Sequence, residues 1–174
     1  MCIHSEDLEE ECEWLKAALS NYGDLRKAAL AVKEAKLERY RGLSDAGDSY
    51  GQYLLGKCYH SGYGVSCDRK KGLELWILSA EQGNAWGQNG LGGSYRWGWA
   101  VDTDIKRAVE LYILSAEQGN MYSQCALGIC YYNGDGVTQN RDLAKQWLTR
   151  SADQCWWNAS SLLGIIERDE PYRI

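Results

Sequence analysis

Apolar and small residues recur at every fourth position in the stretch SYGQYLLGKCYH, at Gly51, Leu55 and Tyr59. This spacing places the three residues on one face of a helix. The glycine turn at 62–64 interrupts the pattern, and a second helical run, RKKGLELWILSA, follows Asp68. An aspartate at that point can accept hydrogen bonds from the first unpaired N–H groups of a helix. The pattern therefore predicts two short helices joined by a glycine turn.

This helix pair returns with a period of 36 residues. The seven-residue segment LSAEQGN occurs at 78–84 and again, identical in every residue, at 114–120. A fixed period of this length indicates a stacked repeat array. A lone pair of short helices cannot bury its apolar stripe, whereas stacked pairs bury it between them. We therefore expect an all-α fold, a right-handed αα-superhelix (solenoid) of stacked antiparallel helix pairs.

The period makes the chain one repeat domain, residues 1–174. The full repeats are expected at 48–83, 84–119 and 120–155. Terminal repeats of such arrays are atypical because one of their sides faces water. Residues 1–47 therefore indicate a degenerate N-terminal capping repeat, with helices at Ser5–Ser20 and Asp24–Ala46. Residues 156–174 indicate a C-terminal capping helix.

Each full repeat carries the same string of residues. The first repeat has Leu55, Gly56, Tyr59, Gly62, Gly64, Val65, Asp68 and Lys71; the second has Leu91, Gly92, Tyr95, Gly98, Val101, Asp104, Arg107 and Ala108; the third has Leu127, Gly128, Tyr131, Gly134, Gly136, Val137, Asn140 and Ala144. The string resembles the pattern LGxxYxxGxGVxxDxxKA of Sel1-like repeats, which are relatives of the tetratricopeptide repeat with a longer turn. This resemblance implies an adaptor that presents a curved, concave groove to a protein or peptide partner.

The turns carry two expectations of their own. Ala100 stands where the other repeats have the second turn glycine, so the second turn should either strain its backbone or change shape. The valine after each turn, Val65, Val101 or Val137, should be buried beneath it.

Composition narrows the possible functions. The net charge is −5 with acidic and basic residues intermixed, which argues against a nucleic-acid partner because such proteins carry a basic stripe. No run of about 20 apolar residues is present, so we expect no membrane span. The stretch MCIHSEDLEEE is acidic and lacks the apolar core of a signal peptide. We therefore expect a cytoplasmic protein, although a periplasmic or secreted chain whose signal has been removed would look the same.

The chemistry-bearing residues give no support to a cofactor or metal site. The chain has seven cysteines, an odd number that favours reduced thiols, and it has no CxxC pair. Its histidines are His4 and His60 only, so neither a zinc site nor a Ser-His-Asp set is expected. Cys67 lies near Lys70 and Lys71 and is a minor candidate for an activated thiol. We therefore expect a protein that is not an enzyme.

One slot of the first helices departs from the polar character usual in the family. It holds Tyr50, Trp86 and Tyr122, an aromatic series in step with the repeat. Helical spacing places further residues opposite the core face: Tyr53, Lys57, His60, Asn89, Gly93, Arg96, Cys125, Ile129 and Tyr132, with Trp97 and Trp99 in the second turn. Tyr, Trp and Arg dominate interface hot spots, so this surface is the candidate partner-binding site. The alternative is that Tyr and Trp serve as ordinary packing in a chain without Phe.

A second departure lies on the second helices. The chain has Leu78 and Leu114 where the family tends to place a polar residue or a lysine, and Ile77 and Ile113 lie next to them. An exposed apolar strip at this place would favour self-association or a partner. The alternative is that these side chains are buried against the next repeat.

Two alternatives to the adaptor function stay open. Some Sel1-like proteins neutralise toxins, so the same surface would suit an immunity or inhibitor protein. Other, secreted members bind β-lactams and carry regularly spaced disulfide-forming cysteines. Here Cys58 and Cys130 share one slot, but Ser94 interrupts the series. The cysteine series is therefore incomplete, and a secreted β-lactam-binding or hydrolase-type protein is kept as the second alternative.

Overall fold

The computed structural model describes residues 25–154 and 157–168, and within these ranges the chain is helical with no strand. The helices are α2 (Leu25–Asp45), α3 (Ser49–Ser61), α4 (Arg69–Glu81), α5 (Ala85–Trp97), α6 (Ile105–Glu117), α7 (Met121–Asn133), α8 (Arg141–Ala152) and α9 (Trp157–Glu167). The all-α prediction is confirmed. The helix expected at Ser5–Ser20 lies outside the described residues.

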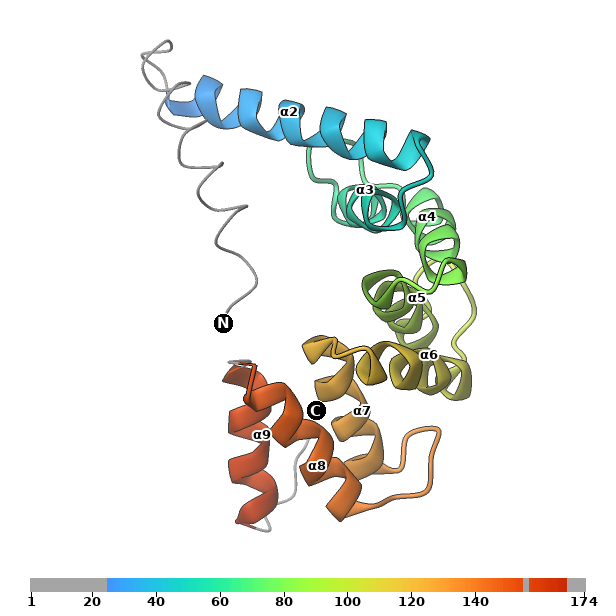
Figure 1. Ribbon diagram of the computed structural model, residues 1–174, viewed down its shortest axis with the longest axis vertical. Coiled ribbons are helices and arrows are strands. Elements are labelled where there is room, and N and C mark those ends of the chain that lie inside the picture. The colour runs from blue at the N-terminus through green and yellow to red at the C-terminus, as the bar shows by residue number, and fades with distance from the viewer. Residues whose placement is uncertain (1–24, 155–156, 169–174) are drawn as a thin grey trace.

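The helices stack in chain order along an arc (Figure 1). Each helix packs on the next one, and α3 also contacts α5. The first helices of the repeats, α3, α5 and α7, lie on the inner side of the arc, and α4 and α6 lie on its outer side (Figure 1). One face of the first helices is therefore turned toward the hollow of the arc.

Polar caps set the beginning of every helix in the three repeats. Asp68, Asp104 and Asn140 each accept a hydrogen bond of 3.0 Å from the backbone N–H group three residues later. The predicted capping role of Asp68 is thus confirmed, and Asn140 performs it as an amide. Asn84 and Asn120 cap α5 and α7 in the same way, each bonding two N–H groups.

The turn between the paired helices keeps its shape when its second glycine is absent. Gly64 and Gly136 adopt φ of 71° and 70°, and Ala100 in the same slot adopts φ of 60°. Ala100 is the one non-glycine residue with positive φ in the described part of the chain. Of the two outcomes expected for this turn, the structure shows the strained backbone.

A close helix contact explains the glycine that follows the leucine in each first helix. The aromatic side chain of Trp76 packs on Gly56, and that of Tyr112 packs on Gly92. A Cβ atom added at either glycine would lie 2.8 Å from the ring, closer than real Cβ contacts. The glycines therefore allow a large second-helix side chain to fill the centre of each repeat.

The valines after the turns are half-buried, so the expectation of full burial is wrong. Val65 packs against the cluster of Leu37, Leu55 and Cys58, and Val137 packs against the cluster around Tyr112. These valines close the edge of the core rather than its centre, because the turn above them is open to water on one side.

The duplicated segment LSAEQGN has a structural role that the sequence pattern did not reveal. Its serine is fully buried and donates to a backbone carbonyl thirty residues earlier, as Ser115 Oγ does to Ala85 O at 2.6 Å. Its glutamine donates to a glutamine side chain at the same separation. The equivalent serine bonds are Ser79 to Ser49 and Ser151 to Met121, and the glutamine bonds are Gln82 to Gln52, Gln118 to Gln88 and Gln154 to Gln124. We call these bonds the Ser–Gln clamp.

Candidate partner-binding face

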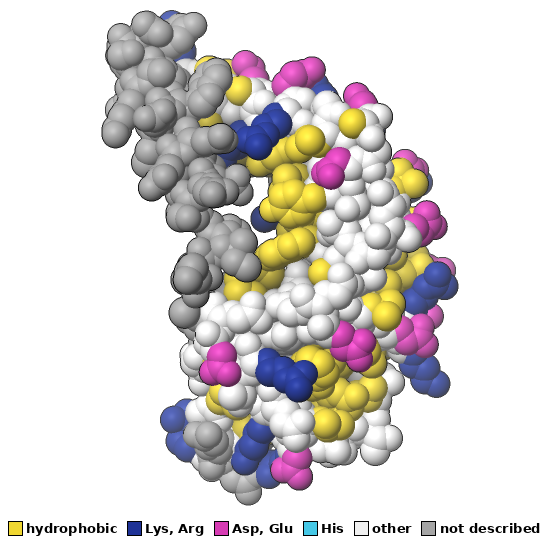
Figure 2. All heavy atoms as spheres, viewed as in Figure 1, with side chains coloured by type: hydrophobic (Ala, Val, Ile, Leu, Met, Phe, Trp, Pro, Cys, Tyr) yellow, Lys and Arg dark blue, Asp and Glu magenta, His cyan; other side chains and the backbone are white. Residues whose placement is uncertain are grey.

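The inner helices carry far fewer charged residues than the outer ones. No Asp or Glu occurs in α3, α5 or α7, and the formal charges of these helices are Lys57 and Arg96. The paired second helices carry charges of both signs: the carboxylates are Glu74, Glu81, Glu110, Glu117 and Asp142, and the cations are Arg69, Lys70, Lys71, Lys106, Arg107, Arg141, Lys145 and Arg150. Figure 2 shows hydrophobic side chains along the inner edge of the arc and side chains of both charges, Asp and Glu together with Lys and Arg, along its outer edge. The inner helices are therefore rich in aromatic residues and poor in charged ones.

Four aromatic rings form one continuous strip across the three repeats. The ring centroids of Tyr50 and Tyr53 lie 5.8 Å apart, those of Tyr53 and Trp86 5.7 Å, and those of Trp86 and Tyr122 5.5 Å. We call these residues the aromatic ladder. Tyr50 is exposed, and the other three are half-buried. The structure thus brings together the three residues predicted to align and adds Tyr53 between the first two.

The ladder rests on polar contacts that fix its position. Trp76 Nε1 donates to the carbonyl oxygen of Tyr53 at 3.2 Å, which ties the ladder to the core of the first repeat. Asn89 Nδ2 donates to Ser123 Oγ at 2.8 Å and so links α5 to α7 beside it. Burial raises the pKa of Tyr53 well above its usual range, with the neighbouring Tyr50 as a smaller cause.

His60 belongs to a second aromatic group rather than to the surface. Its ring lies 5.0 Å from that of Trp76 and 4.6 Å from that of Trp99, measured between centroids. Its Nε2 atom is buried without a hydrogen-bond partner. Burial lowers the pKa of His60, and the nearby Arg69 lowers it further. His60 is thus half-buried between two tryptophans. Its role as a contact residue stays a prediction.

The two turn tryptophans play different parts. Trp97 is exposed and stacks on Trp99 with 6.5 Å between ring centroids, whereas Trp99 is half-buried against His60. Trp97 therefore stays a candidate contact residue, and Trp99 mainly supports the packing around His60.

Arg96 is engaged in a junction between the second and third repeats. Its guanidinium donates to Asp135 Oδ2 at 3.3 Å and to Cys130 Sγ at 3.1 Å. Only 11% of its side chain is exposed. Burial raises the pKa of Cys130, so the thiol stays protonated beside the guanidinium. The prediction of Arg96 as a surface contact is corrected, since its charge is already used inside the protein.

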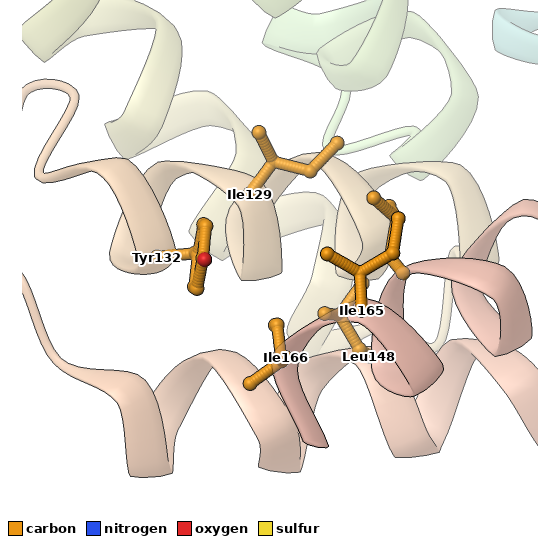
Figure 3. Close-up of a pocket in the computed structure, with 6 residues that line it drawn as sticks. Ile129, Tyr132, Leu148, Ile165 and Ile166 are labelled. Carbon is orange, nitrogen blue, oxygen red and sulfur yellow. The ribbon is translucent and has the colours of Figure 1, made fainter. Parts of the chain in front are cut away.

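Helix α9 packs over two candidate residues of the third repeat, Ile129 and Tyr132. Ile129 and Tyr132 converge with Ile165 and Ile166 of α9 on a small apolar pocket (Figure 3). Tyr132 is only 9% exposed and belongs to the core cluster that α9 completes. Tyr132 is therefore corrected to a core residue, and Ile129 packs against the same cluster.

The four apolar residues of the outer helices, Ile77, Leu78, Ile113 and Leu114, differ in their exposure to solvent. Leu78 and Leu114 are 47% and 50% exposed, so their expected alternative of burial is wrong. Ile77 and Ile113 are half-buried, and Ile113 packs against the core cluster around Tyr112. The self-association strip is therefore reduced to two leucines, each on the outer helix of its own repeat.

The remaining candidates for reactive chemistry are Cys67 and the neighbouring Lys71. Cys67 is exposed and donates to the carbonyl oxygen of His60 at 3.3 Å. Lys71 lies over the ring of Tyr59, 4.5 Å from its centroid, so its charge faces a tyrosine. In the described ranges, no three His, Cys, Asp or Glu residues gather as a metal would need. No helix there is both long and apolar enough to cross a membrane.

The stacked helix pairs and the aromatic inner face define a helical-repeat solenoid. The Sel1 repeat model matches residues 49–84, 87–120 and 122–154. The chain belongs to the Sel1-repeat family, whose members are generally non-enzymatic and typically mediate protein–protein interactions.

Solved structures show the same fold. The chain is similar to c5321, a protective antigen of uropathogenic Escherichia coli strains, with 37% identity, a TM-score of 0.73, and coverage of 79% of this chain and 30% of that one. It is similar to a Sel1 repeat protein from Oxalobacter formigenes, with 27% identity, a TM-score of 0.68, and coverage of 76% and 54%. The chain thus spans about a third and about half of these two proteins.

A third solved structure shares the fold alone. It is cysteine rich protein B of Helicobacter pylori, with 20% identity, a TM-score of 0.59, and coverage of 79% of this chain and 96% of that one. The comparison with curated proteins finds no match.

Proposed function

We propose that the protein is a non-catalytic adaptor that binds a protein or peptide partner across the inner face of its repeats. The aromatic ladder carries this proposal, because its four rings join three repeats into one surface. Tyr and Trp bury a large area with few rotatable bonds, so they are frequent centres of protein interfaces. The lack of carboxylates on α3, α5 and α7 further supports a binding role, since charged groups are depleted at interface cores.

The contact set that we propose is smaller than the one expected from the sequence. It consists of the ladder, Tyr50, Tyr53, Trp86 and Tyr122, flanked by Lys57, Asn89 and Trp97. Arg96, His60 and Trp99 are left out of this set because their side chains are partly buried and contact other residues of the protein.

Capture of a partner from cell extract tests the proposal. The intact protein, Trp86→Ala and Leu114→Ala are immobilised separately, and the captured proteins are identified by mass spectrometry. We expect a partner that is retained by the intact protein and by Leu114→Ala, an exposed apolar residue on the outer side. Trp86→Ala should lose it while keeping its helical circular dichroism spectrum. Equal capture by all three proteins would contradict the proposal.

The same experiment separates the adaptor from the inhibitor alternative. A captured toxin or effector whose activity falls on binding would favour an immunity protein that uses this face. A captured protein that keeps its activity would favour an adaptor.

A second candidate function, self-association, is favoured by the exposure of Leu78 and Leu114. The two leucines occupy equivalent positions of neighbouring repeats, and exposed apolar side chains can pair with a second copy. Light scattering coupled to size-exclusion chromatography tests it. A dimer that becomes a monomer in Leu78→Ser/Leu114→Ser would support it, and a monomer in the unmodified protein would exclude it.

A further inference from the structure

We propose that helix α9 is a second docking surface, which takes an amphipathic helix from a protein partner. That helix carries a small residue, a bulky apolar residue four positions later and a serine three positions after that. The surface lies on a different helix from the aromatic ladder, so the inference goes beyond the proposed function.

The leucine–glycine pair of each first helix is covered by the second helix of the same repeat. In the third repeat, Leu127 is fully buried and Leu148 of α8 packs on Gly128. A Cβ atom added at Gly128 would lie 2.6 Å from Leu148 Cγ, closer than real Cβ contacts. The pair is therefore the place where a first helix accepts a large side chain. The corresponding contacts of the other repeats are Trp76 on Gly56 and Tyr112 on Gly92.

Helix α9 carries the same pair, Leu163 and Gly164, 36 residues after Leu127 and Gly128. Leu163 and Gly164 keep part of their surface exposed, whereas the earlier pair is buried. The nearest described atom to a Cβ placed at Gly164 is Arg168 Nη1, at 3.9 Å. α9 lies at the end of the arc beside α8, and no helix follows it in the part of the chain that the structure describes (Figure 1).

The opposite side of α9 is packed against the rest of the protein. Ala159, Leu162 and Ile166 are at most 8% exposed and share a core cluster with Leu148 of α8. α9 is thus held firmly by the preceding repeat. Its open side is the one that, in the three earlier repeats, faces a second helix.

The second helices of the three repeats show which chemistry such a pair accepts. In α8, the carbonyl oxygen of Ala144 lies 3.2 Å from the Cβ position of Gly128, because a small residue lets the backbones approach. Ser151 Oγ then donates to Met121 O at the start of α7, at 2.8 Å. The same pattern recurs in all three helices: Gly72, Trp76 and Ser79; Ala108, Tyr112 and Ser115; Ala144, Leu148 and Ser151.

This pattern matches the mode of recognition in which a helix lies in an apolar groove and contacts it at positions i, i+4 and i+7. The helices of this chain that carry the pattern are α4, α6 and α8, and their small, bulky and serine residues are all buried within their own repeats. A second folded copy therefore has none of these helices to give, and the occupant is a helix of a different protein.

Fluorescence anisotropy with the intact protein tests the inference. The probe is a labelled, end-capped peptide with the sequence of α6, Ile105–Glu117, which has the pattern. Two control peptides carry Tyr112→Ala or Ala108→Leu. The proteins are the unmodified chain, Gly164→Leu, Trp86→Ala and Ser66→Leu, which adds the same side chain on an exposed turn residue. Circular dichroism checks that each variant keeps its helices.

We expect the α6 peptide to bind the unmodified chain, Trp86→Ala and Ser66→Leu alike. Gly164→Leu should weaken binding by about tenfold or more, because its side chain fills the place of the bulky anchor. The Tyr112→Ala peptide should bind more weakly although alanine favours the helix, so lost helicity is not the cause. The Ala108→Leu peptide should also bind more weakly, since leucine keeps the two backbones apart.

Thermal melting tests whether the face is open. Gly164→Leu should melt at or above the temperature of the unmodified chain, because the site has room and leucine favours a helix over glycine. The matched variant Gly128→Leu should melt lower, since its side chain would collide with Leu148. An equal fall in both variants would overturn the inference, because the pair would then be covered from within the chain.

Three binding results would also overturn it: no binding of the α6 peptide, equal binding by Gly164→Leu, or equal binding of the Tyr112→Ala peptide. Loss of peptide binding in Trp86→Ala with full binding by Gly164→Leu would place the peptide on the ladder instead. Failure of the proposed function is a separate result, because it is judged by capture of a partner with Trp86→Ala.

Discussion

The side-chain amide of Gln118 donates a hydrogen bond of 2.8 Å to the side-chain oxygen of Gln88, thirty residues earlier. The same bond recurs between Gln82 and Gln52 in the preceding repeat, also at 2.8 Å. Each bond joins the end of a second helix to the start of the first helix of the same repeat. These bonds account for the glutamine of the duplicated segment LSAEQGN, because it forms the same hydrogen bond in both copies.

The Ser–Gln clamp leads to a prediction about stability. Ser115→Ala removes a fully buried hydroxyl that donates to Ala85 O and accepts from Ser123 Oγ. The part-buried carbonyl of Ala85 and the buried hydroxyl of Ser123 would each lose this partner. We therefore expect a loss of about 1–3 kcal/mol in the free energy of unfolding. Urea denaturation followed by circular dichroism measures it. Ser66→Ala, on an exposed turn residue, is the matched control and should change little.

Two substitutions in the turns should change the stability of the protein in opposite directions. Ala100→Gly should stabilise the protein by roughly 0.5–1 kcal/mol, because glycine adopts the positive φ of 60° without steric cost. Gly64→Ala should destabilise it by about the same amount, since Gly64 has φ of 71° in the equivalent place. Thermal melting of the two variants beside the unmodified protein gives the answer. Shifts of the same sign would contradict this account of the turn.

Arg96→Ala should lower stability more than it lowers partner affinity. The substitution leaves Asp135 and the Cys130 thiol without their shared donor. We expect a loss on the order of 1–3 kcal/mol in the free energy of unfolding, because hydrogen bonds to charged groups are the stronger ones. Denaturant unfolding and binding titration of the same variant separate the two effects. An intact stability with a large loss of affinity would return Arg96 to the binding surface.

His60 should make stability depend on pH in the mildly acidic range. Burial between Trp76 and Trp99 lowers its pKa in the folded state, so protonation favours the unfolded chain. The stability that neutral His60 contributes is present above the ordinary histidine pKa of about 6.5 and is lost as pH falls below it. Thermal melts between about pH 7 and pH 5 should therefore show a decline that is smaller in His60→Gln. An identical decline in both proteins would assign it to other groups.

The repeat period, the helix pairs and their caps could be predicted from sequence because they depend on local spacing. Asp68 and Asp104 stand one residue before a helical run, and no distant element changes what they bond. The strained turn at Ala100 was likewise visible as a departure from a repeated glycine. These features follow from one repeat and its copies.

The burial and contacts of each inner-face residue depend on neighbours that lie outside its own repeat. Tyr132 occupies the slot of His60 and Arg96, but α9 covers it. His60 is enclosed by Trp99, which comes from the next repeat. Arg96 finds Asp135 in the turn of the repeat that follows. Equivalent slots thus have different surroundings, which alignment of the repeats alone could not show.

The measurement that tests the central claim most directly is partner affinity for Trp86→Ala, taken together with its melting temperature. The account predicts an affinity loss of at least about 2 kcal/mol, because Trp86 lies between Tyr53 and Tyr122 at the middle of the ladder. The helical spectrum should persist. Unchanged affinity with a collapsed melting temperature would show that the ladder is core packing and that the partner binds elsewhere.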